Sequence, residues 1–155
     1  MPVTYSCLRY HIVFGTCART SLIPEAKRHP LYAYMRGIVN NLGGTIVQIG
    51  GTSDHVHLLV AAPPRLSVAE LVSRIKANSS RWVSKQWPSF YRFAWQSGYG
   101  AFTVGVREMD RLIAYIRHQK EHHEKLAFID EMSKLLASHG IDPALATSSG
   151  ETGER

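Results

Sequence analysis

Cysteine is scarce in this sequence. The 155 residues include two cysteines, Cys7 and Cys17, which lie ten positions apart. An extended segment would hold their Cα atoms about 33 Å apart, whereas a disulfide needs them within about 7 Å. We therefore expect two reduced thiols and no cysteine-based zinc site.

Hydrophobic segments of membrane length are also lacking. The longest apolar stretch, Leu58–Ala62, is far shorter than the roughly 20 residues of a membrane-spanning helix. The start of the chain, Met1–Tyr10, has neither the basic residues nor the long apolar segment of a signal peptide. These features predict a cytoplasmic protein with no membrane partner.

Acidic residues are outnumbered, with 12 Asp and Glu against 18 Lys and Arg, which gives a net charge of +6. The excess is concentrated between residues 65 and 92, and eight of the 15 aromatic residues lie between 82 and 102. Basic residues beside aromatic ones are typical of proteins that bind nucleic acid. A solvated helix followed by an aromatic-rich core strand has the same composition, so both interpretations stay open.

Hydrophobic periodicity predicts the elements of the fold. The expected strands are Cys7–Phe14, Thr45–Ile49, His55–Ala61 and Phe93–Val104, and Gly98 and Gly100 are candidate breaks in the last. The expected helices are one that ends at Gly43, one that opens at Ser67 with a capping box to Glu70, and those over Arg107–Leu126 and Phe128–His139.

This order of elements, β-α-β-β-α-β with helices appended, predicts an α+β protein of the ferredoxin-like (split β-α-β) plan. Its antiparallel sheet carries helices on one face and leaves the other face free. We expect one domain over residues 1–126, a helical extension over 127–146 and a disordered tail over 147–155, where Ser, Thr, Gly and Glu dominate.

The sequence His55-Val56-His57 is the sharpest local feature. On a strand, residues two apart point to the same face with their Cα atoms about 6–7 Å apart, so both imidazoles can reach one metal ion. An ordinary pair of histidines on a half-exposed strand has the same pattern. Asp54 is either a turn residue or a hydrogen-bond partner of one histidine.

Tyr115 and Gln119 form the second feature. They are four residues apart, so on one helix they lie one above the other, and His122 falls in the same sector on the flank of the buried stripe. A side chain on this flank can reach a site between the helix and another surface. A tyrosine at the edge of the core is the alternative. His11 and His29 carry no functional prediction.

Several motifs occur together in a set order. These are Tyr10-His11-Ile12-Val13-Phe14, Asp54-His55-Val56-His57-Leu58-Leu59, Ile75-Lys76 with Ser79-Ser80, the run Trp95-Gln96-Ser97-Gly98-Tyr99-Gly100-Ala101-Phe102, and Tyr115-Ile116-Arg117-His118-Gln119. In this order and spacing the chain resembles the single-tyrosine HUH transposases of small bacterial insertion sequences, including the REP-associated tyrosine transposases. The resemblance covers about residues 4–126.

The resemblance implies an active site. His55 and His57 correspond to the metal ligands, Gln119 to the third ligand and Tyr115 to the nucleophile, which forms a 5′-phosphotyrosine with single-stranded DNA. We expect Mg²⁺ or Mn²⁺, because both accept phosphate oxygens and water as ligands.

The resemblance also implies partners. These are single-stranded DNA with a hairpin and a second copy of the chain, since one tyrosine per chain must serve two DNA ends. The basic helix would contact the DNA backbone through Arg74, Lys76, Arg81 and Lys85. The alternatives are a non-catalytic single-stranded nucleic-acid-binding protein, and a domesticated or replication-type HUH nickase.

Overall fold

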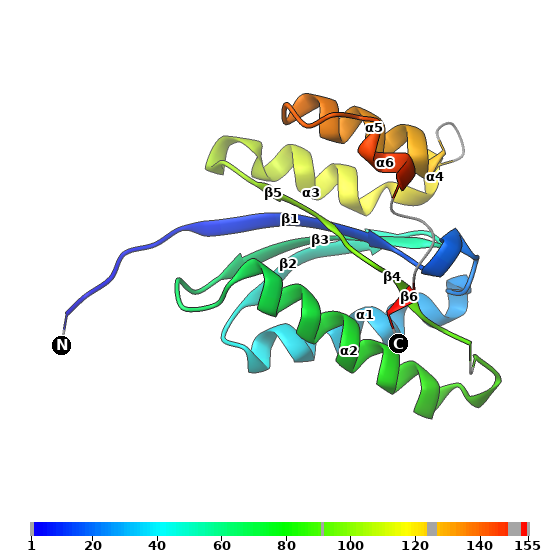
Figure 1. Ribbon diagram of the computed structural model, residues 1–155. Coiled ribbons are helices and arrows are strands. Elements are labelled where there is room, and N and C mark those ends of the chain that lie inside the picture. The colour runs from blue at the N-terminus through cyan, green and yellow to red at the C-terminus, as the bar shows by residue number, and fades with distance from the viewer. Residues whose placement is uncertain (1, 91, 124–126, 149–152, 155) are drawn as a thin grey trace.

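The fold is built around a four-stranded antiparallel sheet with the strand order β2-β3-β1-β5 (Figure 1). It is seen in a computed structural model that describes residues 2–90, 92–123, 127–148 and 153–154. The strands are β1 (Leu8–Gly15), β2 (Thr45–Gly51), β3 (His55–Ala62) and β5 (Gly100–Thr103). This topology confirms the predicted ferredoxin-like plan.

Two long helices, α1 (Glu25–Asn41) and α2 (Val68–Gln86), cover one face of the sheet (Figure 1). The main hydrophobic core lies beneath them, and it includes the alternate β3 residues Val56, Leu58 and Val60. The predicted capping box opens α2, where the Ser67 hydroxyl accepts a 3.1 Å hydrogen bond from the backbone N–H of Glu70. The alternation of β3 was therefore predicted correctly on this side.

The other face of the sheet is also covered, which corrects the expectation that it is free. Helices α3 (Met109–Arg117), α4 (Gln119–His123), α5 (Phe128–Ser138) and α6 (Leu145–Ser148) lie on this side (Figure 1). His55, His57 and Leu59, which share this face of β3, are all fully buried. The C-terminal extension therefore contributes to the same folded body as the sheet.

The helix expected over Arg107–Leu126 is interrupted. A 3₁₀ turn, η3 (Val106–Glu108), precedes α3, and His118 separates α3 from α4 with the non-helical angles φ −100° and ψ 27°. Residues 124–126 lie outside the described residues. Because of the break, Gln119 begins a new helix instead of continuing the helix of Tyr115.

The predicted strand Phe93–Val104 is divided near Gly98, one of its two expected breaks. It forms the short strand β4 (Trp95–Gln96) and then β5, with Gly98 between them in the left-handed region at φ +82°. The buried indole N–H of Trp95 donates a 2.9 Å hydrogen bond to the Ser79 hydroxyl, which ties β4 to α2. The remaining 3₁₀ turns are η1 (Cys17–Arg19) and η2 (Pro88–Phe90).

Part of the tail expected to be disordered is described. Residues 147–148 end α6, and β6 (Gly153–Glu154) pairs with β4, so these four residues differ from the expectation. Residues 149–152 and 155 lie outside the described residues. Among the residues that the structure does describe, no helix is long and apolar enough to cross a membrane.

Candidate active site

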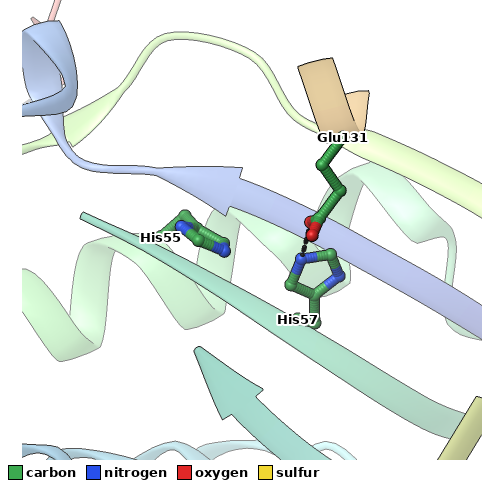
Figure 2. Close-up of side chains that lie close together, drawn as sticks. All are labelled: His55, His57 and Glu131. Carbon is green, nitrogen blue, oxygen red and sulfur yellow. Dashed lines mark ion pairs between the residues drawn. The ribbon is translucent and has the colours of Figure 1, made fainter. Parts of the chain in front are cut away.

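The two histidines of β3 point into the layer between the sheet and the C-terminal helices. The Nε2 atom of His55 lies 3.1 Å from the amide oxygen of Gln119, at the start of α4. The Nε2 atom of His57 lies 2.5 Å from a carboxylate oxygen of Glu131, on α5 (Figure 2). These four side chains, which are at most 3% exposed, therefore meet from three different elements.

The second ring nitrogen of each histidine, Nδ1, is hydrogen-bonded to a residue outside this group of four side chains. The Nδ1 atom of His55 lies 2.8 Å from the Asp54 carboxylate and 2.9 Å from the Thr52 hydroxyl. The Nδ1 atom of His57 lies 2.8 Å from Nε2 of His11, on β1. Asp54 is thus a partner of a histidine, which was one of its two predicted roles. With both Nδ1 atoms engaged, both Nε2 atoms face the shared space.

The arrangement fits a metal ion. One ligand atom each from His55, His57 and Glu131 lie within 4.8 Å of one another, and the Gln119 oxygen adds a fourth donor beside His55. Ligating histidines usually have their second ring nitrogen hydrogen-bonded, as both are here. Two nitrogen donors with amide and carboxylate oxygens make a mixed set that suits a divalent cation.

Tyr115 lies beside this cluster on α3. Its ring stands edge-on to that of His57, with the centroids 5.6 Å apart and the planes at 82°. Burial raises the pKa of the Tyr115 hydroxyl, and the charge of Glu131 raises it further, so the phenol is protonated at neutral pH. Burial next to His57 also lowers the pKa of His11 to about 3, so that His11 is neutral.

A glycine allows α3 to approach the sheet closely. Gly50 of β2 is paired with His57, and a Cβ atom at Gly50 would lie 2.2 Å from the carbonyl oxygen of Ile116. The backbone next to Tyr115 therefore rests directly on the strand beside His57. This contact brings together the predicted nucleophile and the predicted metal ligand.

The predicted DNA-binding residues are divided. Arg74, Arg81 and Lys85 are exposed on α2. This helix covers the face of the sheet opposite α4 and α5, the helices that contact the histidines (Figure 1). Lys76 is only 4% exposed, and its ammonium group donates hydrogen bonds to the carbonyl oxygens of Gln96 (2.8 Å) and Gly98 (2.6 Å). The structure thus corrects the expectation for Lys76, which holds the turn between β4 and β5.

Sequence reasoning missed three residues of this site. Glu131 and Phe128, which stacks on His55 with the ring centroids 4.2 Å apart, lie beyond the region of resemblance. His11 carried no functional prediction. One signal pointed to Glu131. It lies three residues after the buried Phe128 and four before the partly buried Leu135, on an apolar stripe of α5 where an acidic residue is unusual.

Comparison with known proteins identifies the family. A model of the family "Transposase IS200 like" matches residues 4–119, so the chain belongs to the IS200-like transposase family. It is 29% identical over 118 residues to the transposase for insertion sequence element IS200 of Salmonella typhimurium. The aligned region covers 73% of this chain and 77% of that protein. It is 25% identical over 121 residues to the ISDra2 transposase TnpA of Deinococcus radiodurans, covering 74% and 86%.

Two solved structures share the fold. The crystal structure of a putative transposase from Deinococcus radiodurans gives a TM-score of 0.64 at 23% identity, covering 77% of this chain and 95% of that one. The structure of a REP-associated tyrosine transposase bound to a REP hairpin gives 0.61 at 12% identity, covering 81% and 74%. The resemblance found in the sequence is thus confirmed: the chain is a transposase by family, a class that cleaves DNA and transfers strands.

Proposed function

We propose that this transposase cleaves and rejoins single-stranded DNA through the hydroxyl of Tyr115, beside a divalent metal ion. The observation that carries the proposal is the convergence of His55 Nε2, His57 Nε2 and the oxygens of Gln119 and Glu131 on one buried space, with the Tyr115 ring against His57. A phosphate between the phenol and these ligands would meet both a nucleophile and a positive charge.

The ligands in this proposal are the two histidines, Gln119 and Glu131. Glu131 adds a charged oxygen to the set expected from the sequence. Oxygen ligands favour Mg²⁺ or Mn²⁺ over zinc, and Mn²⁺ also accepts imidazole readily. When bound, the ion polarises a phosphate oxygen and stabilises the charge that develops on it.

Tyr115 performs the covalent step. Its oxygen attacks the phosphorus, the bond from phosphorus to the 3′ oxygen breaks, and a 5′-phosphotyrosine and a free 3′-hydroxyl result. The proton lost by the phenol balances the one gained by the 3′ oxygen. Since one phosphate ester replaces another, a 3′-hydroxyl can attack the phosphotyrosine and rejoin the strand without an added energy source.

A cavity beside Tyr115 supplies a route for the DNA. It measures about 400 Å³ and lies between β5, α3 and α5. Its lining includes Tyr115, His11, Phe102 and Arg111. The strand can therefore approach the tyrosine from the side of α3, where the Arg111 guanidinium is available to a phosphate.

Cleavage is tested with purified protein, Mg²⁺ or Mn²⁺, and labelled single-stranded DNA that carries hairpins from the DNA flanking the gene. We expect a covalent protein–DNA adduct on a denaturing gel with single-stranded but not duplex DNA. Tyr115→Phe should form none, whereas the control Tyr5→Phe, at a residue 92% exposed, should match the wild type. An undiminished adduct with Tyr115→Phe would place the nucleophile elsewhere.

The hairpin is proposed to bind on α2. Arg74, Arg81 and Lys85 are exposed there, and the half-exposed Tyr34 stacks on Trp82 next to them, with the ring centroids 4.9 Å apart. Cations beside aromatic rings suit a DNA backbone with unpaired bases. The REP-associated relative bound to a REP hairpin supports this class of partner.

Binding and cleavage should separate, because α2 covers the face of the sheet opposite α4 and α5 (Figure 1), and these two helices contact the histidines. His57→Ala should lose cleavage but keep hairpin binding. Binding without an adduct in the wild type would favour the alternative, a non-catalytic single-strand-binding protein. Against that alternative, β3 presents buried histidines where such a sheet would present exposed aromatic residues.

We also propose that the working unit is a homodimer, because one Tyr115 per chain must act on two DNA ends. Gly105 precedes η3 and α3, so it is placed to let the tyrosine helix dock on its own sheet, as in this structure, or on a partner's. The test co-expresses Tyr115→Phe with His57→Ala. Shared sites would restore part of the cleavage, since one site of each heterodimer is intact. Verified heterodimers without activity would show that each chain completes its own site.

A further inference from the structure

His11 is a buried polar residue that the proposed chemistry leaves without a task. It lies on β1, next to β3, and is 4% exposed. Its residue pair in the β1–β3 register is Leu59, so His57 is its diagonal neighbour on the same face of the sheet. The two imidazoles stack with centroids 5.1 Å apart and planes at 25°, and Nε2 of His11 lies 2.8 Å from Nδ1 of His57.

The chemistry of imidazole assigns a direction to this hydrogen bond. A histidine that binds a cation through Nε2 gives that nitrogen's lone pair to the ion, so its one remaining proton is on Nδ1. The Nδ1–H of His57 must then be the donor to His11. His11 Nε2 must be the acceptor, which places the proton of the His11 ring on its own Nδ1.

We propose that His11 is a positioning residue: it accepts a hydrogen bond from Nδ1–H of His57 and so fixes the tautomer and ring orientation that direct His57 Nε2 to the metal. The inference rests on the proposed metal site. Both histidine ligands of β3 then have an acceptor for their Nδ1 proton: Asp54 for His55 and His11 for His57. Outer partners of this kind usually contribute 10–100-fold to metal affinity.

An apolar side chain could fill the space of His11 but could not accept a hydrogen bond. The neighbouring rings are Phe102, at 6.0 Å, and Tyr115, at 6.4 Å between centroids, so packing alone would be satisfied by phenylalanine. Glutamine differs in shape, yet its amide oxygen can take the place of the Nε2 acceptor. The two substitutions therefore separate hydrogen bonding from packing.

The experiment measures the dissociation constant of Mn²⁺ for the full chain by calorimetry and by the electron paramagnetic resonance signal of free Mn²⁺. We expect His11→Phe to weaken binding by about 10–100-fold and His11→Gln to recover most of this loss. His29→Phe, at an exposed histidine of α1, is the matched control and should bind as the wild type does. Thermal unfolding of each variant establishes that it is folded.

Each outcome decides the question. Wild-type affinity in His11→Phe, or equal losses in the phenylalanine and glutamine variants, would overturn the role of His11. If the wild type itself fails to bind Mn²⁺, or His57→Ala binds it equally well, the proposed metal site is wrong instead. If His11→Phe does not fold, NMR of the Mg²⁺-loaded wild type decides instead. The Nδ1 proton of His57 must give a signal with a through-space contact to the His11 ring. Absence of that proton signal refutes the proposal.

Discussion

Gly50→Ala tests how closely the tyrosine helix must rest on the sheet. A Cβ atom at this position would lie 2.2 Å from the Ile116 carbonyl oxygen, whereas ordinary contacts of a Cβ begin near 3.4 Å. The helix α3 must therefore recede by about 1 Å, since neither the backbone of β2 nor that of α3 can bend away cheaply. Tyr115 precedes Ile116 and must move with it.

The expected effect is large on chemistry and modest on stability. A displacement of about 1 Å in a catalytic group can lower the rate by about 100-fold. Overpacking of this kind costs about 1–3 kcal/mol in the free energy of unfolding, which most domains of this size tolerate. Hairpin binding should not change, because Arg81 and its exposed neighbours on α2 lie on the far side of the sheet.

The assay is the single-turnover rate of covalent adduct formation on labelled hairpin DNA, at a temperature well below the melting point of each variant. Gly37→Ala is the matched control: this glycine is exposed within α1, and a Cβ there meets no atom within 4 Å. It should leave the rate unchanged. A wild-type rate for Gly50→Ala would refute the argument that the contact with Ile116 positions the nucleophile.

Substitutions at Ser79, at Lys76 with Arg81, and at Glu131 test other parts of the structure. Ser79→Ala leaves the buried N–H of Trp95 without this acceptor and should lower the free energy of unfolding in urea by about 1–3 kcal/mol; an unchanged midpoint would contradict it. Lys76→Met should also lower the free energy of unfolding, whereas Arg81→Ala should change it by no more than about 0.5 kcal/mol. Arg81→Ala should instead weaken hairpin binding and reduce its salt dependence by about one phosphate contact. If Lys76→Met weakens hairpin binding and Arg81→Ala lowers stability, Lys76 is the DNA ligand. Glu131→Gln removes a negative charge from the ligand set and should weaken Mn²⁺ binding about tenfold or more, so an equal dissociation constant would exclude Glu131 as a ligand.

Lys76 shows how far local sequence patterns reach. Its charge led to the prediction of a DNA contact at the surface, which conflicts with its place on the buried stripe of α2 beside Val72, Ser79 and Val83. The structure resolves the conflict because the turn after β4 offers two carbonyl oxygens to the ammonium group. Those acceptors lie 20 and 22 residues away, and no local pattern could predict them.

Strand alternation and helical periodicity act between near neighbours in the chain, so the sequence alone predicted most of the elements, their order and the face of β3 that carries His55 and His57. The resemblance gave Tyr115 and Gln119, already noted for their spacing, their expected roles as nucleophile and third metal ligand. That this face is buried, and that Glu131 joins it, follows from the packing of the C-terminal helices over the sheet. Glu131 lies 74 positions after His57 in the chain, so their contact depends on how α5 packs over the sheet rather than on any spacing along the chain.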